Sequence, residues 1–165
     1  MPLTYEPIAT TTLSSTTNTI TFSSISSTYT DLRISFFGRA SSGYIRTRLR
    51  FNGDTAGNYG WAYLGGTRLS VQASSSMGIT YISSDLEGIT PAQPSFYSFD
   101  IFSYAGSTKK TSLSTCSEDK NTDGRVSTFV SVWNSTAAIN SVTIIASEST
   151  FAVGTIATLY GIKAA

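Results

Sequence analysis

The feature that most constrains the fold of this chain is the alternation of apolar and polar residues in short segments. Residues typical of turns separate these segments. Between Leu32 and Phe36 the apolar side chains fall at every second position. This is the pattern of a strand with one face on a core and the other in water. Such segments recur about every 10 to 15 residues, with no helix of useful length between them. The pattern predicts an all-β protein of antiparallel strands, either a sandwich or a barrel.

Eight segments have the clearest strand pattern, and four shorter ones are candidates for edge strands or loop ribbons. The eight are residues 19–22, 31–38, 44–51, 96–104, 109–116, 126–134, 141–146 and 155–162. The four are residues 5–9, 59–64, 68–72 and 79–82. Residues that tolerate positive φ predict turns at 52–54, 56–58 and 65–66 and a hairpin turn at 121–124. The serine-rich residues 70–78 are expected to form a loop.

The length of 165 residues suits one domain with a core of its own. Residues 18–165 are expected to form the sandwich, and residues 1–17 an extended N-terminal strand and arm. Residues 10–17 are Ser and Thr except for Leu13, which is typical of an extended or flexible connector. The arm is a candidate clamp on a neighbouring subunit, with Tyr5, Ile8 and Leu13 as its apolar contacts.

The surface of this chain is expected to be rich in hydroxyl groups and poor in charge. Ser and Thr make up about a third of the residues, whereas charged residues are 13% and the net charge is +1. Such a weak charge gives no long-range field, so neither nucleic acid nor a membrane is an expected partner. No apolar stretch approaches the roughly 20 residues of a membrane-spanning helix. This composition favours contacts with other copies or with neighbouring proteins.

Catalytic side chains are scarce in this chain, which has no histidine and one cysteine, Cys116. Histidine is the commonest general base and metal ligand, so its absence argues against an enzyme and against a zinc site. The acidic pairs Asp85 with Glu87 and Glu118 with Asp119 are expected in loops, and neither has the pattern of a general acid with its base. We expect no catalytic residue, no metal and no cofactor.

One loop offers several oxygen ligands close together. The side-chain oxygens of Asn52, Asp54 and Asn58 are of the type that binds calcium, but a calcium site normally has more than the one carboxylate present here. A turn held by its own Asn and Asp side chains is the favoured interpretation.

Three arginines, Arg46, Arg48 and Arg50, fall at alternate positions of segment 44–51. Strand geometry therefore places them on one face, about 7 Å apart, with apolar residues on the other. Guanidinium groups at that spacing repel one another unless carboxylates or anions lie between them. One interpretation is a docking face for an acidic partner subunit or an anionic glycan. The other is a solvated outer face paired to Asp or Glu on the next strand.

A second candidate binding surface is the aromatic row Tyr59, Trp61 and Tyr63. On one strand face these rings would form a flat platform on which a host-surface glycan could stack. The alternative is that they fill the core or an interface. In segment 126–134, Phe129 and Trp133 share the face opposite the valines and are expected to pack against a second layer or another copy.

Several stretches along the chain are distinctive when they are taken in order. They are residues 5–13 (YEPIATTTL), 20–25 (ITFSSI) followed by 29–32 (YTDL), 50–54 (RFNGD) with 58–59 (NY), 133–139 (WNSTAAI) and 157–162 (ATLYGI). Together they resemble a family of small virion proteins of tailed bacteriophages with a jelly-roll sandwich. The resemblance spans nearly the whole chain.

The resemblance implies a jelly-roll fold and a structural role in the virion, without catalysis. The first hypothesis is a capsid decoration (cement) protein, a homotrimer that binds and stabilises the shell of the major capsid protein. The second is a tail fibre or spike component, or an adhesin that binds a host receptor or glycan. The family pattern does not include the row Arg46, Arg48 and Arg50, so the use of that face stays open.

Overall fold

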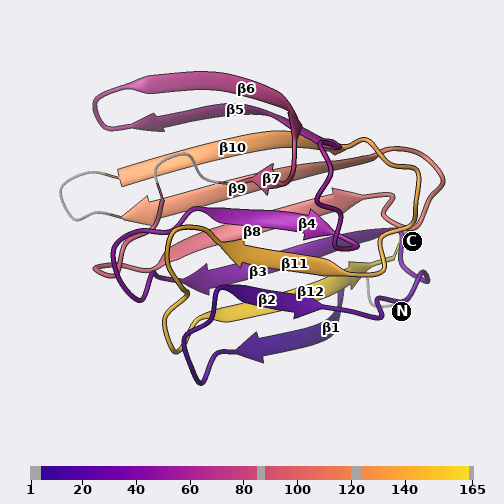
Figure 1. The fold of residues 1–165 in the computed structure, drawn as a ribbon, viewed down its shortest axis with the longest axis horizontal. Coiled ribbons are helices and arrows are strands. Elements are labelled where there is room, and N and C mark those ends of the chain that lie inside the picture. Colours follow the sequence, from indigo (N-terminus) through magenta and orange to yellow (C-terminus); the bar gives the residue numbers. More distant parts are fainter. Residues whose placement is uncertain (1–4, 85–87, 120–123, 164–165) are drawn as a thin grey trace.

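The computed structural model describes residues 5–84, 88–119 and 124–163 and shows a β-sandwich of two antiparallel sheets (Figure 1). The larger sheet has the order β1 (Tyr5–Thr12), β12 (Ile156–Ile162), β3 (Asp31–Gly38), β8 (Ser95–Phe102), β9 (Lys110–Asp119), β10 (Gly124–Trp133), β5 (Tyr59–Thr67), β6 (Val71–Ile79). The smaller sheet has the order β2 (Thr19–Phe22), β11 (Val142–Ala146), β4 (Thr47–Phe51), β7 (Ile82–Ser83). The described residues contain no helix, so the all-β sandwich expected from the sequence is confirmed.

The core lies between the two sheets because each strand directs every second side chain inward. In β3, Leu32, Ile34 and Phe36 are buried and alternate with residues that face outward. Leu49 of β4 and Ile144 of β11 are buried from the opposite sheet. Each such side chain contributes roughly 1.5–3 kcal/mol through burial of its apolar surface. Period-two alternation is therefore the pattern that specifies this fold.

Two hairpins widen the larger sheet beyond the area that the smaller sheet covers. The hairpins β5–β6 and β9–β10 are far apart in sequence, yet they lie side by side in the order β9-β10-β5-β6. Figure 1 shows β5 and β6 at one end of the sandwich, away from β2 and β11. The remaining strands form a two-layered body with four strands in each sheet. We call the four hairpin strands the extension.

Most strand predictions are confirmed, and residues 19–22 and 31–38 are correct at both ends. The strand predicted at 44–51 begins only at Thr47, because Ile45 forms an isolated bridge to Ile89. The loop predicted at 70–78 is wrong, because residues 71–78 belong to β6. The strand predicted at 68–72 coincides with β6 only at residues 71–72. Backbone hydrogen bonds to β5 hold β6 in place. Most of its side chains are exposed, so its sequence shows no alternation of apolar and polar residues.

Two further turn and loop predictions are corrected. Gly65 and Gly66 lie inside β5, where the ring of Tyr63 occupies the space that a side chain at Gly65 would need. Glu118 lies on β9, and its side chain is buried. The hairpin turn predicted at 121–124 lies outside the described residues except for Gly124, which pairs with Asp119 at the ends of β9 and β10. Asp85 and Glu87 also lie outside the described residues.

The predicted N-terminal arm is an edge strand of the chain's own sandwich. Residues 5–12 form β1 and pair with β12, and the Leu13 N–H continues the contact by donating to the Thr155 carbonyl (2.9 Å). Ile8 and Leu13 pack against the core, while Tyr5 is half exposed beneath the guanidinium of Arg33. The arm does not extend away from the body, so Ile8 and Leu13 are not free to clamp a neighbour.

The valines of β10 alternate as core residues do, yet they lie on the outer face of the strand. Phe129 and Trp133 point inward and are 0% and 3% exposed, as expected for packing against a second layer. Val126 and Val130 point outward and are 64% and 57% exposed. The rings bury more apolar area than the valines, so the face that carries them turns to the core.

Substitutions at two neighbouring positions of β10 test this orientation. Phe129→Ala removes a ring that packs on Tyr63 and Trp61, with ring centroids 4.8 Å and 5.6 Å away. We expect it to lower the free energy of unfolding by about 3–5 kcal/mol. The matched control Val130→Ala should change it by less than about 1 kcal/mol. Denaturant unfolding of both variants measures the difference, and similar losses would contradict the assignment of the faces.

Candidate binding surfaces

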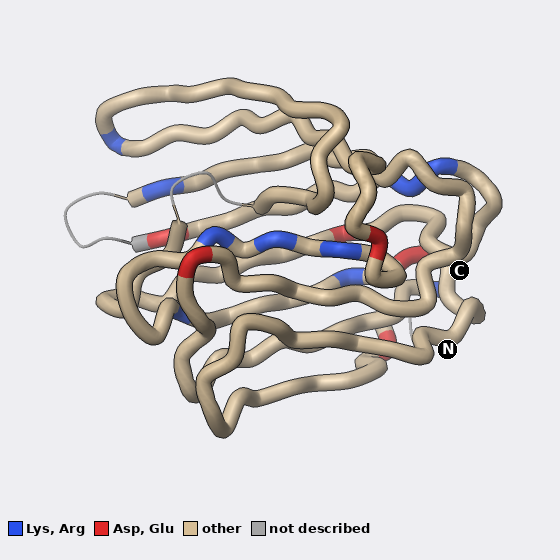
Figure 2. Tube along the Cα trace, in the orientation of Figure 1, with Lys and Arg blue, Asp and Glu red and all other residues tan. Residues whose placement is uncertain are grey.

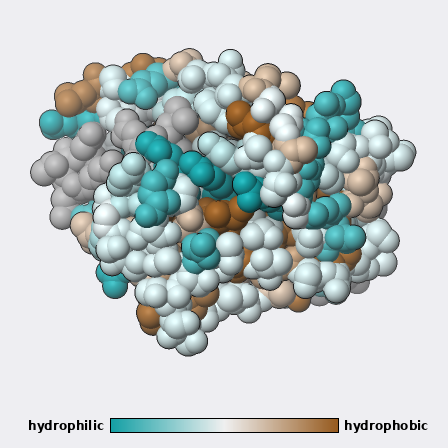
Figure 3. Space-filling view, viewed as in Figure 1, coloured by the Kyte–Doolittle hydropathy of each residue, from teal (hydrophilic) through white to brown (hydrophobic). Residues whose placement is uncertain are grey.

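The arginine row lies on the outer face of the smaller sheet. Thr47, Leu49 and Phe51 of β4 are buried, so Arg48 and Arg50 between them face outward. Arg46 precedes the strand and continues the row. Figure 2 shows the basic residues following one another along β4, and Figure 3 shows a hydrophilic strip over this face. The shared face expected from the sequence is therefore present.

Neighbouring side chains hold the guanidinium groups in place. Oε1 of Glu148, in the segment after β11, lies 3.4 Å from Nη1 of Arg46 and 3.6 Å from Nη2 of Arg48. The Ser147 hydroxyl donates to Oε2 of the same carboxylate. Nε of Arg50 donates to the Thr80 carbonyl (2.9 Å). One carboxylate thus bridges two arginines, and a backbone oxygen fixes the third.

Aromatic rings support the same row. The guanidinium carbon of Arg48 lies 4.1 Å from the ring centroid of Tyr81, and that of Arg46 lies 5.4 Å from the ring centroid of Tyr44. Such cation–π contacts contribute about 0.5–1 kcal/mol at exposed sites and restrict the side chains. The row is therefore partly neutralised by a carboxylate, as one interpretation of the sequence expected, and its guanidinium groups are preorganised. Docking of a partner on this face stays a prediction.

The aromatic row does not form the platform expected for a glycan. Tyr59 and Tyr63 are 1% and 5% exposed, and Trp61 is half-buried against Phe129. Burial raises the pKa of Tyr59 to about 12, and its hydroxyl accepts a hydrogen bond from the Phe51 N–H (3.1 Å). These rings face inward because β5 lies next to β10, whose inner face is also aromatic. The core-filling alternative is confirmed for this row.

The Asn52–Asn58 loop is organised by the carboxylate of Asp54. Its Oδ2 accepts hydrogen bonds from Nδ2 of Asn58 (2.9 Å) and Nε1 of Trp133 (2.7 Å), and its Oδ1 accepts from the Ala56 N–H (2.8 Å). These bonds, the one from Asn58 first, lower the pKa of Asp54. Both carboxylate oxygens are used by the loop itself. These are the hydrogen bonds expected of a turn held by its own Asn and Asp side chains.

Lys110 is a buried amine that the sequence gives no reason to single out. Its Nζ donates to the carbonyl oxygens of Gly106 (2.7 Å), Thr108 and Thr136 (3.4 Å). Burial lowers the pKa of this lysine. Because three carbonyls surround the ammonium group, Lys110 closes the loop before β9 and offers no free nucleophile.

The outer face of the extension carries an apolar surface that the sequence pattern does not predict. The strand registers align its side chains in four rows: Val126–Gly66–Val71, Thr128–Leu64–Ala73, Val130–Ala62–Ser75 and Val132–Gly60–Met77. Leu64, Val71, Met77, Val126 and Val130 are each more than half exposed. A contiguous exposed apolar surface is a feature of interaction sites. We call it the outer apolar face.

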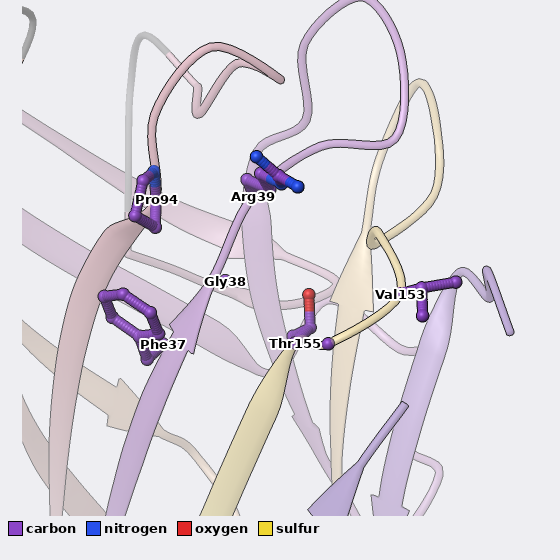
Figure 4. Close-up of a pocket in the computed structure, with 7 residues that line it drawn as sticks. Phe37, Gly38, Arg39, Pro94, Val153 and Thr155 are labelled. Atoms are coloured by element: carbon purple, nitrogen blue, oxygen red, sulfur yellow. The ribbon is translucent and has the colours of Figure 1, made fainter. Parts of the chain in front are cut away.

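A pocket of about 300 Å³ lies where β3 ends near the start of β12. The described residues that line it are Phe37, Gly38, Arg39, Pro94, Val153, Gly154 and Thr155. Figure 4 shows Phe37 and Pro94 on one side of it and Val153 on the other. Among these lining residues the ionisable side chain is the guanidinium of Arg39. The pocket therefore offers a positive charge but no general base.

Comparisons of the chain with models of known families, with curated proteins and with solved structures find no match. Across residues 5–84, 88–119 and 124–163, no group of three or more His, Cys, Asp or Glu side chains is placed to hold a metal ion. The same ranges contain no helix long and apolar enough to cross a membrane. What the chain binds is therefore inferred from its own surfaces.

Substitution of Asp54 tests its role in the loop and gives a defined pH dependence. Asp54→Ala leaves the indole N–H of Trp133 without its acceptor, so we expect a loss of about 1–3 kcal/mol in unfolding free energy at pH 7. The pKa of Asp54 is lowered on folding from 3.8, so its charge stabilises the fold above that pH. This contribution is lost as the pH falls through the lower, folded-state pKa.

Denaturant unfolding of the wild type and of Asp54→Asn between pH 7 and pH 2 isolates the charge, since Asn keeps one acceptor oxygen. The wild type should be more stable than this variant at pH 7, and the difference should shrink in acid. A difference that is independent of pH would contradict the role of the carboxylate charge.

Proposed function

We propose that this chain is a structural protein of a tailed-bacteriophage virion with no enzymatic activity. In this proposal it decorates the capsid, where it binds the shell of the major capsid protein and stabilises it. The motifs at 5–13, 20–25, 29–32, 50–54, 58–59, 133–139 and 157–162, taken in order, support the family. The hydroxyl-rich and weakly charged surface supports a role in assembly.

The strand order supports the jelly-roll part of the proposal. Without the hairpins β5–β6 and β9–β10, eight strands remain. Numbered 1 to 8 along the chain, they lie in the orders 1-8-3-6 and 2-7-4-5. Successive strands then lie in opposite sheets, except for β4 and β7, which pair with each other. Such interleaving is expected when two Greek keys are wound together.

The observation that carries the docking part of the proposal is the preorganised arginine row on β4. Glu148 and Tyr81 hold Arg48, and the Thr80 carbonyl holds Arg50, so little side-chain entropy remains to be lost on binding. Guanidinium groups bind carboxylates with two parallel hydrogen bonds. A sheet face with this row suits an acidic surface of a shell subunit.

The tail fibre or spike alternative would place the same sandwich elsewhere in the particle. Its glycan-binding form relied on an exposed aromatic row, and the burial of Tyr59 and Tyr63 removes that platform. No other described surface favours the alternative over the capsid. We therefore retain the capsid proposal, with the virion, assembled in the host cytoplasm, as its location.

Binding of the purified protein to empty shells of the major capsid protein from the same phage tests the proposal. Arg46→Gln with Arg48→Gln removes two charges and leaves polar, uncharged side chains in their place, so we expect the affinity to fall about tenfold. Arg39→Gln, which removes an exposed charge at the pocket rim, is the matched control and should bind as the wild type does. Added salt should weaken the wild type more than the double variant.

Two results would contradict the proposal. Equal affinity of the wild type and the double variant would show that the arginine row is not the docking surface. Failure of the folded wild type to bind shells, together with its detection in the tail of intact particles by electron microscopy, would place it with the tail proteins instead.

A further inference from the structure

The two edges of the larger sheet are built differently. The β1 edge carries Pro7, an irregular register between Pro7 and Ala9, and an ion pair between Glu6 and Lys163 (2.9 Å). Proline, bulges and charges are the usual means of preventing an edge from pairing with another strand. The β6 edge is nine residues long and has neither proline nor charge. Only its end is irregular, at Gly78, where φ is +70°.

The open edge of β6 presents a regular set of backbone donors and acceptors. Along an antiparallel ladder, hydrogen-bonded residue pairs alternate with pairs that are not hydrogen-bonded. At the turn before β6 the Thr67 N–H donates to the Ser70 carbonyl (2.9 Å), so Thr67 and Ser70 form a hydrogen-bonded pair. Every second residue of β6 after Ser70 is then hydrogen-bonded to β5. Gln72, Ser74 and Ser76 therefore bond to β5. The residues whose N–H and C=O groups point to the open edge are Val71, Ala73, Ser75 and Met77.

The sequence of β6 is complementary to itself when two copies run antiparallel about Ser74. In that register Val71 faces Met77 of the other copy, and Ala73 faces Ser75. All four open-edge residues take part, which gives about eight hydrogen bonds across the contact. The register ends before the irregularity at Gly78, so nothing interrupts it.

The same register joins apolar surface to apolar surface. Val71 and Met77 are 79% and 71% exposed and belong to the outer apolar face. Pairing brings each of them beside its partner, so the outer apolar faces of two copies become continuous. Packing of Val71 on Met77 removes from water two of the most exposed apolar side chains of the described chain.

The two paired β6 strands carry no charge of their own. The β6 strand contains no ionisable residue, and the charged residue that precedes it, Arg68, lies in the β5–β6 turn. Arg68 is six residues from Ser74, so the two copies of Arg68 would lie roughly 40 Å apart at opposite ends of the contact. At that distance their repulsion is screened at physiological salt.

We propose that β6 pairs antiparallel with β6 of a second copy about a two-fold axis at Ser74, so that their larger sheets become one continuous sheet. The contact is isologous and therefore closes as a dimer. It differs from the homotrimer implied by the family resemblance, and it holds whether or not the chain belongs to a virion.

Sedimentation velocity over about a hundredfold range of protein concentration tests the dimer. The wild type should shift from 17.6 kDa to twice that mass as the concentration rises. Ser74→Lys places two like charges directly opposite each other across the axis and should remain a monomer, as should Ser74→Glu. An equimolar mixture of the two variants should restore the dimer, because Lys then faces Glu. The control Thr12→Lys, on the β1 edge, should dimerise as the wild type does.

Hydrogen exchange of the wild type gives a second readout that needs no substitution. The amides of Ala73 and Ser75 should exchange at least about tenfold more slowly at high than at low concentration. The amides of Gln72 and Ser74, already bonded to β5, should change less. Unchanged exchange at Ala73 and Ser75 would overturn the proposal, even if the Ser74 variants did not fold.

Other outcomes would also overturn it. These are a trimer, a monomer at every concentration, or Ser74→Lys dimerising as tightly as the wild type. The dimer and the docking proposal fail separately, because Ser74→Lys should still bind shells and the Arg46 and Arg48 double variant should still dimerise.

Discussion

The rest of the structure depends on the contact among Phe51, Tyr59 and Trp133. Their ring centroids lie 5.7 to 6.3 Å apart, and the three rings come from β4, β5 and β10. This contact joins the smaller sheet to the extension, which otherwise projects beyond it. The Tyr59 hydroxyl bonds to the Phe51 backbone, and the Trp133 indole bonds to Asp54. Because Phe51 points inward here, the arginines of β4 must point outward.

Much of the fold follows from residues whose side chains alternate across a half-buried strand. Segment 31–38 was predictable to the residue because Leu32, Ile34 and Phe36 are buried and their neighbours are not. The β6 strand was not predictable, since nearly all its residues are exposed and its stability comes from backbone bonds to β5. Such bonds are available to any sequence without proline, so they leave no signal in side-chain type. Which strands are neighbours is likewise decided by contacts between residues far apart in sequence.

Of the candidate surfaces, the sequence predicted the shared face of Arg46, Arg48 and Arg50 and offered pairing to a carboxylate as one interpretation, but it did not identify that carboxylate. Glu148 lies about a hundred residues away, and it reaches the row because β11 pairs with β4. For Tyr59, Trp61 and Tyr63 the sequence correctly predicted that the three side chains share one strand face. It did not decide whether that face meets the core or the solvent. An alternating strand has two faces, and only the neighbouring strand decides which one meets the core. For the same reason the sequence did not predict the outer apolar face. Val126 and Val130 have the spacing of core residues, and only the inward position of Phe129 and Trp133 shows that they face outward.

The two proposals thus assign contact surfaces of different chemistry to different sheets of the sandwich. The arginine row on β4 acts through charge, whose effect falls with ionic strength over a Debye length of about 8 Å at physiological salt. The β6 edge and the outer apolar face act through backbone hydrogen bonds and apolar burial, which salt does not screen. If both proposals hold, added salt should weaken attachment to an acidic surface much more than pairing between copies. Pairing also doubles the number of arginine rows in one rigid particle. Attachment by two rows is tighter than by one where the spacing of the target sites matches theirs, since the second row then binds at a high effective concentration.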